Sequence, residues 1–347
     1  MKIIYLVPTN VYSGAENITL LLAKHLAGKH QVFYASPDGP IEVYLKEAKV
    51  QHISISKMSI KEVIRIYKEI QPDVFHAVDF RTSTYCAIAG VPFVAHLHQN
   101  PLWLQKLTIN SLAMLFFSCR AKKVICISES IINEYVFSNL IRHKVIVIEN
   151  VVDSDRVLKQ AGGSMVCNKQ FDIGFVGRLE KEKDPLRFIK IAHKIIQERE
   201  IKAIVIGDGS LKEDVENVIR ENNLENNIIM TGFLKNPYKE IAKIKIIIMP
   251  SIWEGFGLVA VEGMLLGCPV LGTRVGGLQK VIGVENKNIC ENDEQFIQRI
   301  KELANDHKEW LKCSEEVKTR AMCFCDVEKY IDKIEKIYLN TRQEREL

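Results

Sequence analysis

The sequence lacks long apolar runs. No window of eighteen residues is both uncharged and apolar, which excludes an ordinary transmembrane helix. Residues 1–8 have the pattern of a β-strand and show neither the apolar core nor the small-residue cleavage site of a signal peptide. We therefore expect a cytoplasmic protein.

The sequence also lacks the patterns that mark metal, nucleic-acid and dinucleotide sites. Its nine cysteines include no C-x-x-C pair, and Cys323 and Cys325 have poor spacing for zinc, so we expect reduced, buried thiols and no metal. Basic residues are not clustered with aromatic ones, which argues against nucleic acid. No G-x-G-x-x-G follows the first predicted strand, which disfavours an NAD-dependent oxidoreductase.

Charge is distributed unevenly along the chain. The formal net charge is +4, but residues 1–150 alone carry sixteen Lys and Arg against eleven Asp and Glu. A basic face in this half can meet a membrane surface, or an anionic lipid-linked or polymeric acceptor. The alternative is an ordinary solvated surface. We therefore keep open a peripheral location at the inner face of the membrane.

What is present is the composition of a globular protein, with 47% hydrophobic and 26% charged residues. Short apolar runs alternate with segments of helical spacing, which predicts α/β architecture with parallel sheets. The predicted strands are Ile3–Val7, Gln31–Ala35, Val74–Ala77, Phe93–His98, Lys123–Ile127, Val145–Ile148, Asp172–Val176, Ala203–Ile206, Ile228–Thr231, Lys245–Pro250 and Pro269–Leu271. The predicted helices are Glu16–Leu26, Ile60–Ile70, Pro185–Gln197, Leu211–Asn222 and Gly257–Leu266.

A chain of 347 residues exceeds what one compact core usually supports, so we expect two domains. The polar loop Gln160–Gln170 interrupts the rhythm and predicts the boundary between Rossmann-like domains at residues 1–160 and 161–326. An amphipathic helix at about 327–340 has an apolar stripe and is expected to pack back on the first domain. Open α/β sheets bind ligands at the carboxyl ends of their strands, so we expect the two domains to enclose a cleft.

The sharpest motif spans residues 251–262, which follow an apolar strand and open a helix. Gly255 and Gly257 permit tight turns, and the free N–H groups of a helix start attract anions. Glu262 lies one turn into the helix, where its carboxylate can accept hydrogen bonds from two vicinal hydroxyls, as a ribose presents them. Glu254 can reach a second set of hydroxyls. The alternative for a glutamate in such a place is a favourable interaction with the helix dipole.

This segment matches the E-x7-E motif of retaining glycosyltransferases, and the chain resembles glycosyltransferase family 4 (glycosyl transferases group 1) over nearly its full length. The resemblance implies the GT-B fold, two Rossmann-like domains that face each other across a cleft. Asp184 departs from the pattern, since many members carry glycine there. The other matching segments are Ser13–Glu16, Phe175–Leu179 with Lys183, Gly207–Gly209, Thr231–Phe233, Asn236–Tyr238 and Val275–Gly277.

The resemblance assigns the donor phosphates to two cations. Arg178 and Lys183 would neutralise the pyrophosphate and stabilise the departing phosphate, on which charge develops in the transition state. Gly14 would let the N-terminal loop approach the same phosphate. The alternative for both cations is a solvated position in the mixed charged run 178–183.

The resemblance also implies which residues bind the transferred sugar and the ribose of the nucleotide. Glu262 would bind the ribose and Glu254 the transferred sugar. The backbone N–H groups near Phe256, Gly257 and Leu258 would meet sugar or phosphate oxygens.

The resemblance also implies a role in sugar binding for one histidine in the first half of the sequence. His98 matches the family's N-domain histidine that faces the transferred sugar. His96 is its rival, and we expect it on the opposite face of the same strand; the alternative for His98 is a structural histidine. Retaining members are thought to use front-side attack, in which the departing phosphate helps to take the acceptor proton, so a carboxylate nucleophile is not required.

Two further segments have competing interpretations. Residues 153–155 read Asp-Ser-Asp, which has the spacing of a D-x-D metal motif but also caps helix starts; we favour the cap, because GT-B enzymes do not follow a metal-dependent design. Leu102–Phe117 is apolar over much of its length and is followed by Arg120, Lys122 and Lys123. It predicts a core helix, with a membrane-interfacial helix as the alternative.

Together these observations predict a retaining hexosyltransferase that needs neither cofactor nor metal. It would move a sugar from a nucleotide-sugar donor, a UDP-sugar by preference, to a saccharide or lipid-linked acceptor in surface polysaccharide or glycolipid synthesis. A GT-B nucleotide-sugar epimerase and a non-catalytic nucleotide-sugar-binding module are the alternatives.

Overall fold

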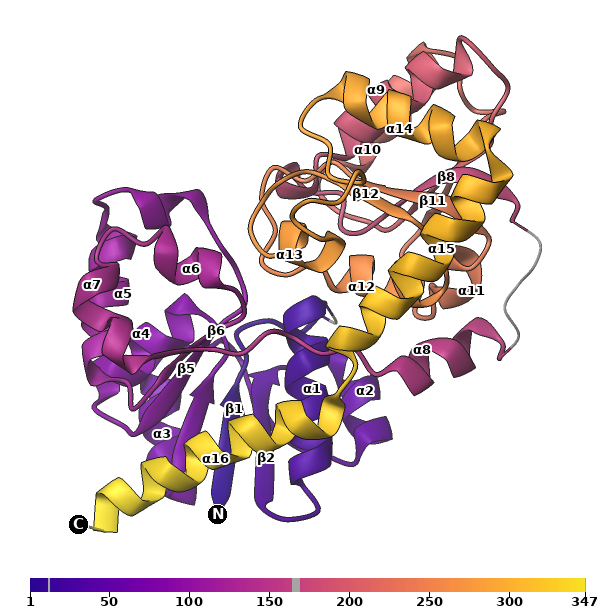
Figure 1. Ribbon diagram of the computed structural model, residues 1–347. Helices are drawn as coiled ribbons and strands as arrows, with labels where there is room; N and C mark the ends of the chain where they lie inside the picture. The colour runs from indigo at the N-terminus through magenta and orange to yellow at the C-terminus, as the bar shows by residue number, and fades with distance from the viewer. Residues whose placement is uncertain (12, 164–168, 347) are drawn as a thin grey trace. The chain divides into compact units, whose positions relative to one another are not determined.

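The computed structural model describes residues 1–11, 13–163 and 169–346 (Figure 1). They form two compact units, unit 1 (Met1–Val151 and Val327–Leu347) and unit 2 (Val152–Asp326). The chain thus passes into unit 2 at Val152, earlier than the predicted boundary at residue 160. The reason is α8 (Ser154–Ala161), which packs against α11 (Tyr238–Ile241) and α12 (Leu258–Leu265) of unit 2. Residues 164–168 of the predicted loop Gln160–Gln170 lie outside the described residues.

The described residues of unit 1 form a seven-stranded parallel sheet in the order β3-β2-β1-β4-β5-β6-β7. The central strands are buried on both faces, which explains why they read as continuous apolar runs in the sequence. The strands are β1 (Lys2–Leu6), β2 (Gln31–Pro37), β3 (Gln51–Ile55), β4 (Val74–Ala77), β5 (Phe93–Leu97), β6 (Val124–Cys126) and β7 (Val145–Val147).

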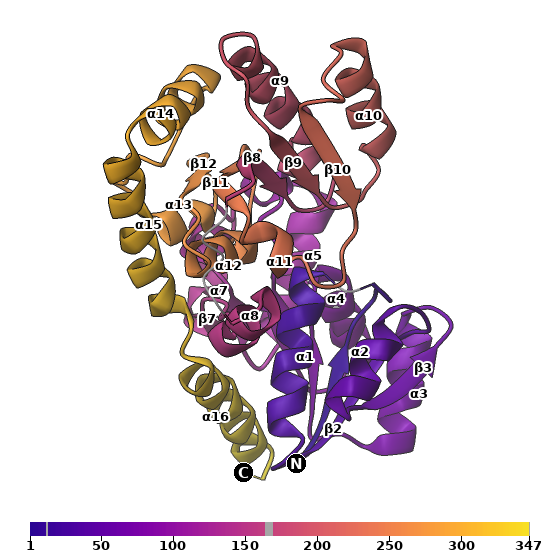
Figure 2. The same ribbon diagram turned by 90° about the vertical axis from the view of Figure 1, so that its right-hand side faces the viewer.

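Helices cover both faces of this sheet. The first two helices and the last one, α16, lie on one face, and α3, α4 and α5 pack side by side on the other (Figure 2). The helices of unit 1 are α1 (Gly14–Leu26), α2 (Ile41–Ala48), α3 (Ile60–Ile70), α4 (Phe80–Ala89), α5 (Ile109–Arg120), α6 (Glu129–Asn133), α7 (Ser138–Ile141) and α16 (Val327–Glu346), with short 3-10 turns η1 (Leu102–Gln105) and η2 (Arg142–Lys144).

The final helix, α16, belongs to unit 1. Its apolar stripe is buried there, with Ile334 and Tyr338 fully removed from solvent. Glu335 adds a polar clamp to the end of α1: its carboxylate lies 3.0 Å from Lys29 Nζ and 2.7 Å from His30 Nε2. The helix therefore completes the core of unit 1 although unit 2 separates it from the rest of that unit in the sequence.

The described residues of unit 2 form a five-stranded parallel sheet in the order β10-β9-β8-β11-β12. The strands are β8 (Phe171–Val176), β9 (Ala203–Ile206), β10 (Ile228–Gly232), β11 (Ile244–Met249) and β12 (Val270–Gly272). The helices besides α8, α11 and α12 are α9 (Pro185–Ile196), α10 (Lys212–Glu221), α13 (Leu278–Ile282), α14 (Asp293–Asn305) and α15 (His307–Ala321), with 3-10 turns η3 (Lys181–Lys183) and η4 (Met322–Phe324). All eleven predicted strands are present, within one to two residues at each end.

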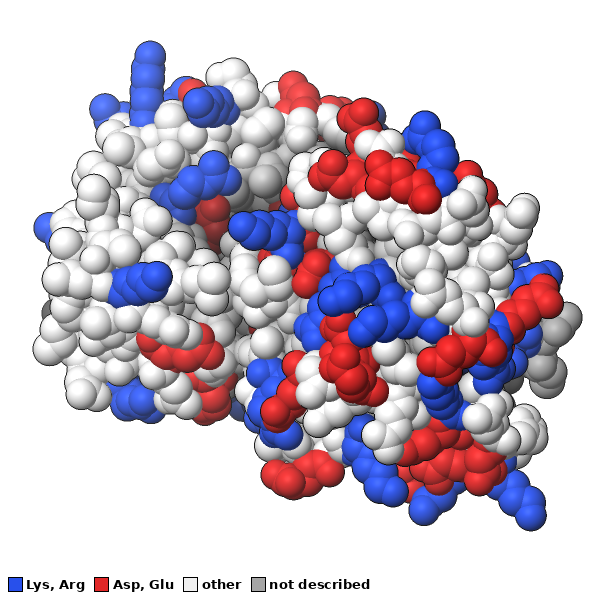
Figure 3. Space-filling view, turned by 90° about the horizontal axis from the view of Figure 1, so that it is seen from above, with Lys and Arg blue, Asp and Glu red and all other residues white. Residues whose placement is uncertain are grey.

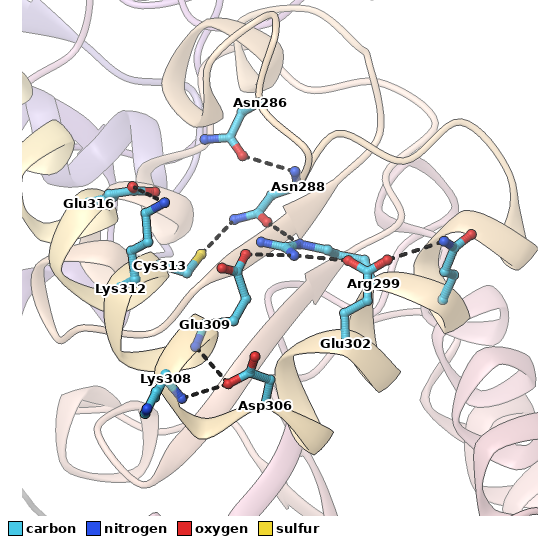
Figure 4. Close-up of polar contacts among 11 residues, drawn as sticks. Asn286, Asn288, Arg299, Glu302, Asp306, Lys308, Glu309, Lys312, Cys313 and Glu316 are labelled. Carbon is cyan, nitrogen blue, oxygen red and sulfur yellow. Dashed lines mark hydrogen bonds and ion pairs between the residues drawn. The ribbon is translucent and has the colours of Figure 1, made fainter.

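A buried arginine joins α14 and α15 to the edge of this sheet (Figure 4). Arg299 is 7% exposed; it donates from Nε to Asn288 Oδ1 at 3.0 Å and from Nη1 to Glu302 and Glu309 at 3.0 and 3.1 Å. Asn288 is itself fully buried, in a loop that bridges to β12 through Ile289. Because a buried charge is tolerated only when it is paired and hydrogen-bonded, this cluster fixes how the two helices dock.

We predict that Arg299→Ala lowers the free energy of unfolding by about 2–4 kcal/mol, because it leaves the Asn288 amide buried with an unpaired oxygen. Lys312→Ala is the control: Lys312 is 72% exposed and lies 4.0 Å from Glu316, so its loss is expected to change stability by less than about 0.5 kcal/mol. Urea unfolding of both variants checks this, and equal midpoints for Arg299→Ala and the wild type would contradict it.

Candidate functional site

The motif residues of unit 2 lie in loops at the carboxyl edge of its sheet. Arg178 follows β8, Lys183 ends η3, Glu254 follows β11, and Glu262 lies inside α12. Because parallel strands end at the same edge, segments that are far apart in the sequence meet there (Figure 1).

Backbone hydrogen bonds tie these loops to one another. The N–H of Ile252 donates to the carbonyl of Glu182 at 2.9 Å, and the N–H of Gly277 donates to the carbonyl of Glu254 at 3.1 Å. At Gly276, φ is +47° and an added Cβ would lie 1.8 Å from the carbonyl oxygen of Glu254, so only glycine fits. The loop after β11 is thus held from both sides by main chain.

The two predicted cations have different partners. Lys183 forms an ion pair with the Glu254 carboxylate, and both side chains are largely buried. Arg178 does not join them: its guanidinium lies 2.5 Å from Glu182, and the side chain is 52% exposed. The structure therefore brings Lys183 and Glu254 together and leaves Arg178 accessible beside them.

Asp184, the departure from the family pattern, stands directly after Lys183. Its φ of +50° lies in the left-handed region, which glycine adopts freely and aspartate tolerates better than most residues. Its carboxylate caps α9 by accepting from the N–H of Arg187 at 3.3 Å. The aspartate thus accepts a glycine-type backbone conformation and adds a helix cap.

Glu262 is buried within α12. Its Oε1 accepts a hydrogen bond from the Tyr238 hydroxyl at 2.9 Å, and the Arg156 guanidinium donates to the same hydroxyl oxygen at 3.3 Å. Burial raises the pKa of Glu262 to about 7, against the opposing effects of the Tyr238 hydrogen bond and the Arg156 charge. Neither partner is among the predicted site residues: Tyr238 belongs to a motif without an assigned role, and Arg156 stands in α8, which the predicted boundary places in the other domain.

The start of α12 offers unpaired donors. Gly257 is its N-cap, with φ at +96°, and within the described residues the N–H groups of Phe256, Gly257 and Leu258 have no hydrogen-bond partner. The Phe256 side chain is buried against Phe324, with ring centroids 5.6 Å apart, which anchors the loop. Consecutive free N–H groups at a helix start form an anion-binding site.

The glycine-bearing loop of unit 1 is organised by a buried carboxylate. α1 begins at Gly14, and the carboxylate of Glu16 accepts hydrogen bonds from the hydroxyls of Ser13 and Thr9. Glu16 is therefore committed to holding the loop after β1, and the exposed backbone of Gly14 remains at its tip.

His98 follows the last residue of β5. Both of its ring nitrogens are buried and have no hydrogen-bond partner among the described residues, and burial lowers its pKa to about 3, so the ring is neutral. Our expectation that His96 lies on the opposite face is wrong. Side chains two residues apart in a strand share a face, and the rings of His96 and His98 lie 4.0 Å apart between centroids.

The structure also resolves the competing interpretation of residues 153–155. The carboxylate of Asp153 caps α8 by accepting from the N–H of Arg156 at 2.9 Å. Within the described parts of the chain, no group of three or more His, Cys, Asp or Glu side chains is arranged to hold a metal ion. The eight cysteines described are free thiols. Cys119 and Cys323 are exposed, which corrects the expectation that the thiols are buried.

The segment Leu102–Phe117 is divided between η1 and α5. Leu104, Met114 and Phe117 are buried in unit 1, as a core helix requires, whereas Leu107 is 71% and Ile109 86% exposed. Leu102 and Leu112 are exposed as well. The segment is thus half core and half apolar surface. In the described part of the chain, no helix has both the length and the hydropathy of a membrane span.

A hollow of about 1040 Å³ lies elsewhere in unit 2, at the C-terminal end of α9 and between α14 and α15. Its lining mixes cations and anions that pair with each other, such as Arg299 with Glu309 and Lys301 with Glu198. None of the motif residues lines it, so we place the site at the carboxyl edge of the sheet instead.

Comparison with known proteins agrees with this geometry. The model of Glycosyltransferase Family 4 matches residues 12–156, and that of Glycosyl transferases group 1 matches residues 165–320. A relative from Campylobacter jejuni, N-acetylgalactosamine-N,N'-diacetylbacillosaminyl-diphospho-undecaprenol 4-alpha-N-acetylgalactosaminyltransferase, is 23% identical over 90% of this chain and 92% of its own. An Escherichia coli relative, UDP-Gal:alpha-D-GlcNAc-diphosphoundecaprenol alpha-1,3-galactosyltransferase, is 24% identical over 87% of this chain and 85% of its own.

Among solved structures, Anabaena Alr3699/HepE in complex with UDP and glucose superposes with a TM-score of 0.84 at 20% identity, over 97% of this chain and 98% of that one. The likeness extends over both units. Since the two family models together match most of the chain, residues 12–156 and 165–320, the chain belongs to the glycosyl transferases group 1, glycosyltransferase family 4, and has the GT-B fold.

Proposed function

We propose that this glycosyltransferase is a retaining hexosyltransferase that moves a sugar from a UDP-sugar to a lipid-linked saccharide acceptor in surface polysaccharide synthesis. The observation that carries the proposal is the carboxyl edge of unit 2, where unpaired N–H groups, the Lys183–Glu254 pair and the buried Glu262 converge. The printed names of the Campylobacter and Escherichia coli relatives, both acting on undecaprenol diphosphate-linked sugars, support the acceptor class. The UDP bound to the Anabaena structure supports the donor class.

In this proposal the donor's pyrophosphate binds at the start of α12. The N–H groups of Gly257 and Leu258 supply hydrogen bonds, and Lys183 and Arg178 supply positive charge where the leaving phosphate becomes more negative. With the phosphate charge met by these protein groups, the proposed reaction would need neither metal nor cofactor. The family resemblance is the support for Gly14 of unit 1, whose backbone would be a further contact of the same phosphate.

Glu254 and Glu262 would bind hydroxyls rather than attack carbon. Glu254 is held by Lys183, which orients it toward the transferred sugar. Glu262 is held by Tyr238 and accepts from the two ribose hydroxyls once it is ionised. Because both carboxylates have these partners, retention would follow from front-side attack, in which the leaving phosphate takes the acceptor's proton and His98 contacts a hydroxyl of the transferred sugar.

A lipid-linked acceptor calls for contact with a membrane, and we propose the exposed apolar side chains of Leu102, Leu107, Ile109 and Leu112 as the contact surface. No acidic residue occurs between Asp79 and Glu129, whereas five basic residues do. Figure 3 shows, at its left, a face on which uncharged residues predominate, with scattered Lys and Arg side chains and a few Asp and Glu side chains. Exposed leucine and isoleucine beside cations are typical of anionic lipid binding.

The raised pKa of Glu262 leads to a pH-dependent affinity. We predict that a UDP-sugar binds about tenfold more tightly at pH 8 than at pH 6, because the carboxylate that accepts the ribose hydroxyls forms only above a pKa of about 7. Glu262→Gln is expected to bind weakly at both pH values, and Glu225→Gln, an exposed control, to behave as the wild type. Isothermal titration calorimetry with a panel of UDP-sugars measures this; a pH-independent wild type would contradict it.

The phosphate contacts lead to a kinetic prediction. Lys183→Ala is expected to lower kcat by about 100-fold or more, because it removes charge from the leaving phosphate in a partly buried site, and Arg178→Ala is expected to act in the same direction. Lys181→Ala, an exposed cation of the same run, serves as the matched control and should retain activity. Steady-state transfer assays, with the anomeric configuration of the product read by proton NMR, test both parts; an inverted product would refute the retaining assignment.

For the membrane surface, we predict that Ile109→Asp together with Leu112→Asp abolishes co-sedimentation with vesicles containing phosphatidylglycerol. Leu311→Asp, at a leucine of unit 2 that is 47% exposed against 50% for Leu112, should leave binding intact. Transfer to a water-soluble acceptor should be unchanged in both variants. Wild-type protein that remains in the supernatant would rule out this contact surface.

A further inference from the structure

Four buried aromatic side chains of unit 1 form a connected polar chain beneath α16. Tyr5 and His76 are register partners on β1 and β4, His96 lies on β5, and Tyr338 reaches them from α16. The Tyr338 hydroxyl lies 2.6 Å from His76 Nδ1 and 3.4 Å from the Tyr5 hydroxyl, and His76 Nε2 lies 3.0 Å from His96 Nδ1. All four residues are fully removed from solvent.

The chemistry of these groups gives the chain a direction. Tyr338 has one hydroxyl proton, and its geometry also permits donation to the Tyr5 hydroxyl. That contact is long, at 3.4 Å, whereas the imidazole nitrogen at 2.6 Å is both the nearer and the stronger acceptor, so we assign the proton to the bond with His76. His76 Nδ1 is then an acceptor, so its proton sits on Nε2 and is donated to His96 Nδ1. By the same reasoning, His96 carries its proton on Nε2.

The imidazole rings of His76 and His96 stay neutral, so protonation does not disturb this arrangement of donors and acceptors. Burial lowers the pKa of His76 to about 3 and that of His96 well below its usual value, and neighbouring histidines add to the effect. A neutral imidazole has one donor and one acceptor, and which nitrogen is which depends on its partners. Tyr338, on α16, thereby fixes through His76 on β4 the tautomer of His96 on the adjacent strand β5.

The hydrogen-bonded series of side chains ends at His96, next to ring nitrogens that have no hydrogen-bond partner among the described residues. Within the described residues, His96 Nε2 and both ring nitrogens of His98 are buried and make no hydrogen bond. An unsatisfied buried polar group costs about 1–3 kcal/mol, so these three atoms require hydrogen-bond partners from outside the described residues. Adjacent hydroxyls, each a donor and an acceptor, match this set.

We propose that Tyr338 and His76 are positioning residues that lock His96 as an Nε2–H donor, so that His96 and His98 together bind neighbouring hydroxyls of the transferred sugar. This inference rests on the proposed function, because the sugar donor supplies the hydroxyls. In this proposal His96 is no longer an alternative to His98, because both histidines contact the sugar. The helix α16 takes part in sugar binding through the hydrogen bonds of Tyr338.

The tautomers can be measured without any donor. In protein labelled with ¹⁵N-histidine, we expect NMR to show His76 and His96 with protonated Nε2 and unprotonated Nδ1, the signals being assigned from His76→Gln and His96→Gln. Tyr338→Phe should leave both rings as mixtures of tautomers. A wild type protonated at Nδ1 of either ring, or an unchanged tautomer in Tyr338→Phe, overturns the proposal.

The matched control is Tyr330→Phe. Tyr330 lies on the same helix and is almost as deeply buried, but its hydroxyl has no partner among the described residues, so removing it breaks no bond of the chain. We expect Tyr338→Phe to lower kcat/KM for the UDP-sugar about three- to tenfold, as the loss of one hydrogen bond of about 1 kcal/mol implies. Tyr330→Phe should match the wild type in rate and in its histidine tautomers.

A purely structural role predicts something else. UDP lacks the transferred sugar, so Tyr338→Phe should leave its dissociation constant unchanged; equal losses for UDP and UDP-sugar, or an unchanged kcat/KM, overturn the proposal. At His76, glutamine retains an amide donor for His96 and should exceed leucine in activity, and equal activity of the two variants would count against the chain. If the wild type transfers no sugar from any UDP-sugar tried, the proposed function fails. The NMR tautomer result still decides for or against the hydrogen-bonded series from Tyr338 through His76 to His96.

Discussion

The side chains of the unit 2 site depend on loops that hold each other by main-chain hydrogen bonds. The bonds from Ile252 to Glu182 and from Gly277 to Glu254 connect segments that follow different strands, and the lack of a side chain at Gly276 permits the close approach. Main-chain hydrogen bonds do not vary with pH or ionic strength as ion pairs do. The loops that carry Lys183 and Glu254 therefore keep their positions independently of the charges of these two side chains. A site that stabilises developing charge benefits from donors that are already in position before the reaction begins.

Both units hold polar groups in buried places, and the consequences differ with the group. In unit 2 burial raises the pKa of Glu262 into the physiological range, where Tyr238 and Arg156 favour the ionised form. In unit 1 burial keeps three histidines neutral and makes their tautomers, rather than their charges, the variable that neighbours control. The Arg299 cluster shows a third outcome, because there all partners are supplied by the protein and the group serves the fold.

Much of the fold could be predicted because buried parallel strands are short apolar runs, which a sequence shows directly. β3 was missed because it is a five-residue edge strand with a mixed pattern, and α14 and α15 because their polar composition hides the buried side. The positions of Glu254 and Glu262 followed from local spacing. Arg156 near Glu262 and Tyr338 beside His76 could not be predicted, since these contacts join residues 82 or more positions apart through tertiary packing. The expectation that His96 and His98 lie on opposite faces is wrong because residues two positions apart in a strand share a face. That rule needs only the sequence spacing.

The return of α16 to unit 1 has a consequence for the order in which the protein is made. Residues 327–346 leave the ribosome after all of unit 2, so the part of the first sheet that α16 covers, beside α1, waits without its final helix while some 175 further residues are synthesised. Unit 2 has its own sheet and core and can fold during that interval, whereas unit 1 reaches its final packing last. A nascent chain of this design therefore exposes its earliest-made sheet for the longest time, which is the interval in which chaperones would be expected to engage it.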